Sequence, residues 1–192
     1  PSAQAARIAA STGAPLNAAL SAGMLSINKH HGAAIEPAMR MFLYAKDLME
    51  TSKKSPEDFA KDCVRQALEQ KKRLAGYGHR VHTDDPRTKR LLELAKEAAK
   101  DGMYIKLAQL IGEEVSAQMG KPLPLNVDGA IGALLCELDF PVEVSNFFFI
   151  LPRVAGMAAH YHEEITREKP MRNIISAEAE YDGPAPREME KI

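Results

Sequence analysis

The sequence lacks tryptophan, an excess of charge of either sign and any long apolar run. Lys and Arg number 25 and Asp and Glu number 26, so the formal net charge is −1. A general nucleic-acid binder would carry a basic excess or patch, which this composition does not provide. No uninterrupted apolar run approaches the roughly 20 residues that a membrane-spanning helix needs. We therefore expect neither a nucleic acid nor a membrane as a partner.

Cysteine is also scarce. Cys63 and Cys136 both lie in apolar helical patterns, and they form no Cys-x-x-Cys pair. This excludes the common metal and redox motifs and indicates buried thiols in a reducing compartment, so we expect a cytoplasmic location. The first residue is Pro1 rather than Met, which leaves open whether a targeting segment has been lost.

Motifs for several kinds of catalysis are absent. His160 and His162 are two residues apart, which places them on different faces of a helix, and no His-Glu-x-x-His occurs. Gly76-x-Gly78 has neither the third glycine nor the preceding strand of a dinucleotide-binding fingerprint. No serine lies in a nucleophile elbow. We expect no metal site and no permanently bound cofactor.

The residues that dominate the sequence are helix formers, namely Ala, Leu, Met, Lys and Glu, and runs of Val, Ile and Thr are scarce. This composition predicts an all-α protein. Apolar periodicity, with glycine and proline as boundaries, predicts helices over 2–11, 15–28, 34–50, 56–74, 86–101, 103–119, 129–138 and 142–167.

A short loop between two of these helices is the most specific feature of the chain. Gly76 and Gly78 permit backbone turns that other residues resist, and His79 follows directly. Asp85 can cap the next helix, which places Arg87 in its first turn. The loop is suited to holding a ligand, although a plain connector with a solvated histidine has the same spacing.

Two further polar residues also stand at helix breaks beside glycine. His31 precedes Gly32, and Asp128 precedes Gly129. Together with His79 they could supply general acids and a base around one carbon centre. The alternatives are a histidine at a helix C-terminus and an aspartate that caps a helix N-terminus or lies in its first turn.

Two arginines suit a carboxylated substrate. Arg153 follows the apolar stretch 147–151, where an unpaired charge would be costly, so it should face a partner or an anion. Arg87 and Arg153 could each grip a carboxylate through two parallel hydrogen bonds.

Four motifs in a fixed order carry a family resemblance. They are His-Gly-Ala-Ala at 31–34, Gly-Tyr-Gly-His-Arg-Val at 76–81 with Asp-Pro-Arg at 85–87, Asn-Val-Asp-Gly at 126–129, and Arg-Val-Ala-Gly at 153–156. From about residue 2 to residue 173 the sequence resembles the citrate synthase family. The form Val-Asp-Gly-Ala-Ile-Gly at 127–132 is closer to the citryl-CoA lyase module of ATP-citrate lyase than to ordinary citrate synthases.

This resemblance implies an all-helical enzyme that acts on CoA thioesters, usually as a homodimer with a cleft between a large and a small domain. Residues 33–139 would form the small, CoA-binding domain. Residues 1–32 and 140–192 would be the remaining part of the large, dimerisation domain. Acetyl-CoA or citryl-CoA and a 2-oxo acid such as oxaloacetate would be the substrates.

The resemblance also implies roles for individual residues. Asp128 would take the α-proton of acetyl-CoA, and His31 would hydrogen-bond the thioester oxygen. His79 would donate a proton to the oxaloacetate carbonyl, and the roles would reverse when citryl-CoA is cleaved. Arg87 and Arg153 would bind the carboxylates.

Coenzyme A would bind along the glycine loop. The backbone of Gly76, Tyr77 and Gly78 would line the adenine site, and Arg80 would belong to the same site. Coenzyme A would enter as a thioester substrate and not as a permanent cofactor.

The sequence departs from the family pattern at both ends. The family's Asp-His pair, whose histidine binds substrate, would lie upstream of Pro1. Near the C-terminus the family often has Arg-Pro, with the arginine reaching into the partner subunit's site. Here the residues are Lys169 and Pro170, and Arg172 follows, so either Lys169 or Arg172 could take that role.

Three functions from different classes therefore compete. The first is an enzyme that forms or cleaves the carbon–carbon bond of citryl-CoA. The second is a catalytically idle CoA-binding or regulatory subunit with the same fold. The third, a plain helical interaction module, explains none of the histidine–glycine pairs. The presence of all three candidate catalytic groups favours the enzyme.

Overall fold

The computed structural model describes residues 1–78, 85–175 and 180–186, and in these ranges the protein is all-α, as predicted. It has eight α-helices, one 3₁₀ turn and no strand within that part of the chain. The elements are α1 (Ser2–Ser11), α2 (Leu16–Leu25), α3 (Ile35–Ser52), α4 (Pro56–Glu69), α5 (Pro86–Glu97), α6 (Met103–Met119), α7 (Val127–Glu137), η1 (Val142–Val144) and α8 (Phe147–Arg167).

Several predicted helices extend too far. Helices α2, α4 and α5 end at Leu25, Glu69 and Glu97, three to five residues before the predicted limits of 28, 74 and 101. Positive φ angles at Lys71 and Ala99 mark where the chain turns away after α4 and α5. The residues that follow α4 and α5 are mostly exposed and many are charged, so little burial compensates the entropy of continuing these two helices.

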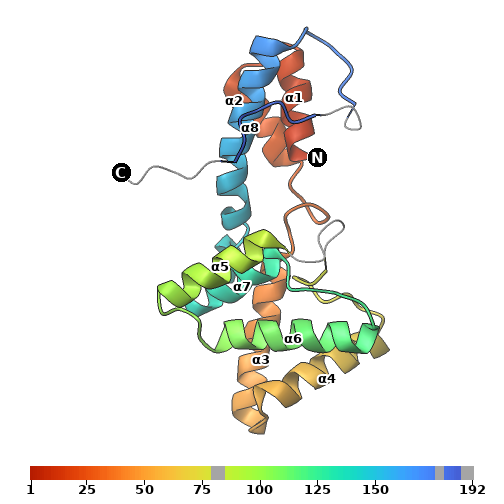
Figure 1. Ribbon diagram of the computed structural model, residues 1–192, viewed down its shortest axis with the longest axis vertical. Helices are drawn as coiled ribbons and strands as arrows, with labels where there is room; N and C mark the ends of the chain where they lie inside the picture. The colour runs from red at the N-terminus through yellow and green to blue at the C-terminus, as the bar shows by residue number, and fades with distance from the viewer. Residues whose placement is uncertain (79–84, 176–179, 187–192) are drawn as a thin grey trace.

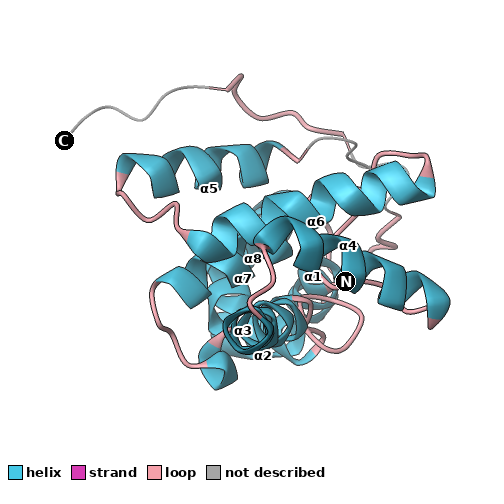
Figure 2. Ribbon diagram, turned by 90° about the horizontal axis from the view of Figure 1, so that it is seen from below, coloured by secondary structure: helices cyan, strands magenta, loops and turns pink. Residues whose placement is uncertain are grey.

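The helices pack in two groups, joined by the segments around residues 26–34 and 138–146 (Figure 1). The α1/α2/α8 group lies at one end of the elongated molecule. The α3–α7 group lies at the other end, where α3 runs along the long axis and is seen end-on from below (Figure 2). The division into a small and a large domain at residues 33–139 stays a prediction.

The core of the α3–α7 group is built around α3. Ile35, Met39 and Phe42 are fully buried along one face of this helix, and fully burying such a side chain contributes roughly 1.5–3 kcal/mol. Gly132 of α7 lets the two helices approach closely, because a Cβ there would lie 3.2 Å from the Cβ of Ala38. Helix α7 is thereby held tightly against α3.

The α1/α2/α8 group is packed through small residues. A Cβ at Gly23 of α2 would collide with Met157 of α8 and would lie 2.9 Å from the backbone oxygen of Ser2. The buried Glu164 of α8 accepts hydrogen bonds from Arg7 of α1 (2.8 Å) and from Arg172 of the C-terminal segment (2.7 and 2.8 Å). These contacts fasten α1 and the C-terminal segment to α8.

One helical stretch in the described part of the chain, Val142–Arg167, is long and apolar enough to cross a membrane by length and composition alone. Arg153 lies near its middle, where a charge at the bilayer centre would cost about 2.5–3.5 kcal/mol. In the structure α8 packs against α1 and α2. Only 11% of the apolar stretch is buried inside the single chain, so most of its apolar side chains remain exposed.

Candidate active site

The glycine loop lies directly against the start of α7. The backbone N–H of Gly78 donates to Pro124 (2.8 Å), and that of Asn126 donates to Gly76 (2.9 Å). Gly76 has a φ of +87°, and a Cβ there would lie 2.6 Å from the Cα of Gly129. Only glycine satisfies both the backbone angle and the close approach. The loop residues 76–78 are thereby positioned beside Asp128.

Asn126, and not Asp128, caps α7. The Oδ1 atom of Asn126 accepts hydrogen bonds from the backbone N–H groups of Asp128 (3.0 Å) and Gly129 (3.1 Å), while its Nδ2 donates to the backbone oxygen of Gly78 (2.8 Å). The capping alternative for Asp128 is therefore wrong, and this residue lies in the first turn. The positive end of the helix dipole favours the ionised carboxylate there.

Asp85 positions Arg87 and joins α5 to α7. Its Oδ1 accepts from the backbone N–H and Nε of Arg87 (3.1 and 2.9 Å), and its Oδ2 accepts from Nη2 of Arg87 (2.8 Å) and the backbone N–H of Val127 (3.2 Å). Chiefly through the bonds from Arg87, the pKa of the buried Asp85 carboxyl falls from 3.8 to about 2. Asp85 in turn raises the pKa of Arg87, and the negative charge of Asp128 adds to this shift.

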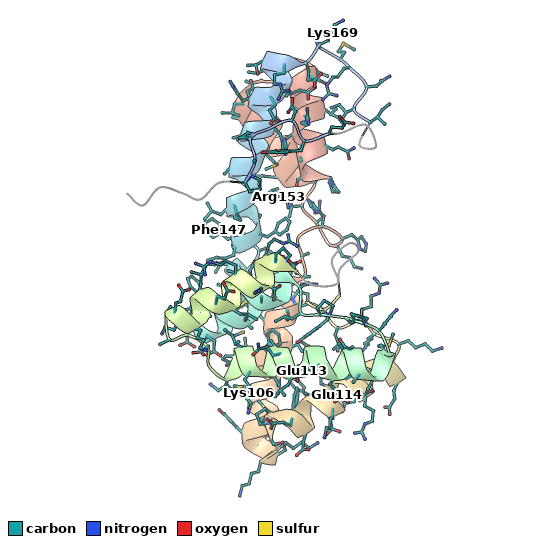
Figure 3. All side chains as sticks on the ribbon, viewed as in Figure 1. Lys106, Glu113, Glu114, Phe147, Arg153 and Lys169 are labelled. Carbon is teal, nitrogen blue, oxygen red and sulfur yellow. The ribbon has the colours of Figure 1, made fainter. Side chains whose placement is uncertain are left out.

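These residues open onto a cavity of about 310 Å³ at the junction of the two groups. Helices α5, α7 and α8 contribute Arg87, Asp128 and Arg153 to its wall, so the structure brings these three predicted residues together. Figure 3 shows Arg153 at this junction, on the part of α8 next to the α3–α7 group. The other lining residues are Ala3, Val127, Ile131, Phe148, Phe149, Pro152, Gly156, Met157 and His160.

His31 does not line this cavity, but it contacts Phe149, which does. Its ring contacts Phe149 edge-on (centroids 5.4 Å apart), and the same Phe149 ring carries the Arg153 guanidinium at 5.1 Å. The Nε2 atom of His31 is 2.9 Å from Oγ of Ser2. Burial, followed by the positive charge on Arg153, lowers the pKa of His31. The imidazole is therefore neutral at pH 7.

The helix-capping alternative for His31 is wrong. Helix α2 ends at Leu25, and Ser26 takes the capping position, so His31 lies well beyond the helix. Gly32 has a φ of +80°, and a Cβ there would lie 2.5 Å from the ring of Phe149. This glycine allows the chain to bring His31 close to Phe149.

The remaining predicted site residues either do not line this cavity or lie outside the described residues. His79 and Arg80 lie outside the described residues, so the triad of His31, His79 and Asp128 stays a prediction. Arg172 is held by Glu164 and does not line the cavity. Figure 3 shows the exposed Lys169 at the far end of α8 from Arg153, so neither C-terminal cation reaches this cavity within one chain.

A second cavity of about 680 Å³ lies against the glycine loop. Its wall includes Tyr77, Gly78 and Asn126, and three cations that the sequence analysis did not single out. These cations are Lys72, Arg73 and Lys121. Tyr77 is anchored through its hydroxyl, which donates to the backbone oxygen of Ala108 (2.9 Å), and burial raises its pKa.

The described ranges contain no cluster of three or more His, Cys, Asp and Glu side chains that could hold a metal ion. The polar groups that converge on the 310 Å³ cavity are instead one carboxylate, two guanidinium groups and an imidazole. Such a set can bind a carboxylated molecule and move a proton.

Comparison with known proteins identifies relatives with this fold. The structure of citryl-CoA lyase from Hydrogenobacter thermophilus is 44% identical, with a TM-score of 0.78, and the alignment covers 99% of this chain and 72% of that one. Citrate synthase from Thermoplasma acidophilum, solved in a ternary complex with carboxymethyl coenzyme A and oxaloacetate, is 28% identical, with a TM-score of 0.69, and the alignment covers 100% of this chain and 50% of that one.

Among curated proteins, the citrate synthase of Saccharolobus solfataricus is 32% identical over 187 residues, which is 94% of this chain and 47% of that protein. The chain spans less than half the length of such relatives. Residues 1–175 match the family model "Citrate synthase, C-terminal domain". This match covers most of the chain, and the chain therefore belongs to the citrate synthase family.

Proposed function

We propose that the protein forms or cleaves the carbon–carbon bond between acetyl-CoA and oxaloacetate, with citryl-CoA as the product or the substrate. The observation that carries this proposal is the convergence of Asp128, Arg87 and Arg153 on one cavity. The 44% identity to a citryl-CoA lyase supports the same chemistry. An idle subunit would have no need for a carboxylate base between two carboxylate-binding cations.

In the direction of synthesis, Asp128 accepts a proton from the acetyl methyl group. The electron pair moves toward the thioester oxygen, which the neutral His31 stabilises by a hydrogen bond, and Ser2 orients that imidazole. The enol carbon then attacks the keto carbon of oxaloacetate, and the family resemblance assigns to His79 the proton that the new alkoxide receives. In the cleavage direction each proton moves the opposite way.

The two arginines bind the carboxylates of the 2-oxo acid or of citryl-CoA. Asp85 orients Arg87 through two side-chain hydrogen bonds. The Arg153 guanidinium is stacked on Phe149, and this geometry leaves its edge N–H groups suitable for a carboxylate. Both cations are therefore oriented before the substrate arrives, which reduces the entropy cost of binding.

The CoA moiety fits the second cavity. Its wall combines the backbone of the glycine loop with Lys72, Arg73 and Lys121, which can neutralise phosphates. Asn126 lines this cavity and also caps the helix that carries Asp128, so a thioester could extend from one cavity to the other. The solved complex of the Thermoplasma citrate synthase with a coenzyme A derivative supports this assignment. Coenzyme A would be a substrate here and not a resident cofactor.

We also propose a homodimer and a cytoplasmic location. Large apolar side chains are exposed on all three helices of the α1/α2/α8 group, including Ile8, Leu25 and Leu151. A second copy of the chain would cover such side chains. The free thiols of Cys63 and Cys136 are compatible with a reducing compartment.

An assay of the full-length protein tests the proposed function. Citryl-CoA is supplied in one reaction, and acetyl-CoA with oxaloacetate in the other, and CoA thioesters are separated by chromatography. We expect conversion in at least one direction. A protein that binds CoA but neither makes nor cleaves citryl-CoA would instead be the idle subunit.

A further inference from the structure

His160 is the one histidine of the described residues that lines the 310 Å³ cavity. It lies on α8 seven residues after Arg153, and Gly156 and Met157 fall between them on the same helix face. All four residues line the cavity. In the sequence His160 stood out only as a candidate metal ligand beside His162, which is exposed and does not line this cavity.

Glu163 fixes the orientation of the His160 ring. Its Oε2 atom lies 3.0 Å from Nδ1 of His160, one helical turn away. A carboxylate accepts hydrogen bonds, so Nδ1 carries a proton and Nε2 is the ring nitrogen left for a ligand. Toward a substrate carboxylate, which can only accept, the ring must donate from Nε2, and it does so when both ring nitrogens carry a proton.

The charges around His160 come from several elements. Arg153 lies on the same helix, Arg87 on α5 and Asp128 on α7 across the cavity. On its other side His160 also lines a groove that includes Arg7 of α1 and Glu168 and Arg172 near the C-terminal segment. Within the cavity the only described carboxylate is Asp128, which is the proposed base. The cavity thus has more cationic than anionic side chains, and His160 as a further donor toward a substrate carboxylate is consistent with this excess of positive charge.

We propose that His160 is a further substrate-binding residue, whose Nε2 atom contacts a carboxylate of oxaloacetate or citryl-CoA while Glu163 holds its Nδ1 atom. This inference rests on the proposed function. It assigns to the cavity a third group for carboxylates, after Arg87 and Arg153. It also explains why a histidine oriented by a glutamate lines a cavity whose other walls are largely apolar.

The expected effect is on binding. A hydrogen bond to a charged group contributes an amount that corresponds to roughly tenfold to hundredfold in affinity. His160→Ala should therefore raise the KM for oxaloacetate about tenfold or more and should leave kcat and the KM for acetyl-CoA within about twofold. His160→Gln should recover part of the loss, because its amide reaches the position of Nε2. Glu163→Gln still accepts from Nδ1 and should have a smaller effect.

The experiment uses the full-length protein with these variants and His162→Ala as the matched control. His162 lies on the same helix but is exposed and outside the cavity, so its variant should behave as the wild type. Steady-state kinetics are measured with oxaloacetate and with acetyl-CoA. Citrate binding is measured by isothermal titration calorimetry, and thermal unfolding confirms that each variant is folded.

The outcomes separate the two proposals. Wild-type protein that neither turns over these substrates nor binds citrate would overturn the proposed function. Active wild-type protein with a His160→Ala variant that keeps both its KM for oxaloacetate and its affinity for citrate would overturn the role of His160 alone. In that case the contact with Glu163 is a surface hydrogen bond of the helix.

Discussion

The carboxylate of Asp85 holds Arg87 through two side-chain hydrogen bonds, with Oδ1 2.9 Å from Nε and Oδ2 2.8 Å from Nη2. The same Oδ2 atom accepts a third bond from the backbone of Val127, the first residue of α7. One buried side chain thus caps α5, orients a substrate-binding arginine and attaches both to the helix that carries Asp128. Stability and substrate binding should both depend on it.

Replacing Asp85 by asparagine tests this relationship. The amide keeps the size of the side chain but cannot accept from Arg87 and Val127 at all the same positions. We expect a loss of about 1–3 kcal/mol in the free energy of unfolding, since partners of a buried group are left unsatisfied. The KM for oxaloacetate should also rise. Urea unfolding measures the first effect, with Asp101→Asn, at an exposed position, as the control.

The pKa of Asp85 predicts how this loss depends on pH. Folding lowers the pKa of the carboxyl from 3.8 to about 2. The stabilisation is therefore fully present above about pH 4 and is lost as the pH falls through 2. The difference in unfolding free energy between wild type and Asp85→Asn should shrink over this window. A difference that stays constant from pH 5 to pH 2 would contradict the assignment.

Gly76 should tolerate no side chain. Its φ of +87° disfavours other residues, and a Cβ would lie 2.6 Å from the Cα of Gly129, which is backbone and cannot move aside. Gly76→Ala should therefore be destabilised by more than the roughly 1 kcal/mol that a left-handed backbone alone costs. Gly120→Ala is the matched control, because Gly120 has a φ of +62° but no atom within 4 Å of a new Cβ. Equal losses in urea unfolding would show that the close approach is unimportant.

Variants of Asp128 and Asn126 should separate the catalytic role of the first residue from the helix-capping role of the second. Asp128→Asn removes the proton acceptor, and general base catalysis typically contributes about 10²–10⁴-fold, so turnover should fall by that factor. Stability should hardly change, because Asn126 is the residue that caps α7. Asn126→Ala should instead lower the free energy of unfolding by about 1 kcal/mol. An Asp128→Asn enzyme with near-normal turnover would exclude Asp128 as the base.

Local sequence signals account for much of this fold. Ser55-Pro56 and Asp85-Pro86 begin helices where predicted, because capping and the φ of proline act within a few residues. The ends of α4 and α5 were overestimated, since they depend on whether the next residues find a surface to bury. Asp128 was singled out at a helix break beside a glycine, Arg87 in the first turn of a helix and Arg153 after an apolar stretch. The family motifs then implied their roles, and the structure brings all three to one cavity.

The features that the sequence analysis missed depend on contacts between distant segments. Lys72 and Lys121 share a cavity because the fold brings the end of α4 close to the end of α6. Within its own chain Arg172 pairs with Glu164, which also binds Arg7 at the opposite end of the chain. His160 could have been found from its seven-residue spacing to Arg153, because both then share one helix face.

The proposed dimer predicts the effect of a charge on the exposed apolar face of α8. Leu151 is 56% exposed in the single chain. Leu151→Glu should dissociate a homodimer because an interface core excludes an unpaired carboxylate. Sedimentation at micromolar concentration measures this, with Tyr44→Glu, exposed on α3, as the control. A wild type that sediments only as a monomer would contradict the dimer.

Arg153 provides the most direct test of how the cavity binds its substrate. Arg153→Ala should raise the KM for oxaloacetate roughly tenfold to hundredfold with a smaller change in kcat, because a charge-assisted contact made in both the ground state and the transition state is lost. The KM of Arg153→Lys should lie between those of the wild type and Arg153→Ala, since lysine keeps the charge but not the planar group that stacks on Phe149. Arg40→Ala, which removes an exposed arginine paired with Glu36 on α3, is the control. An unchanged KM in Arg153→Ala would mean that this guanidinium serves the packing around Phe149, and the carboxylates would then have to be bound by Arg87 and other groups of the cavity.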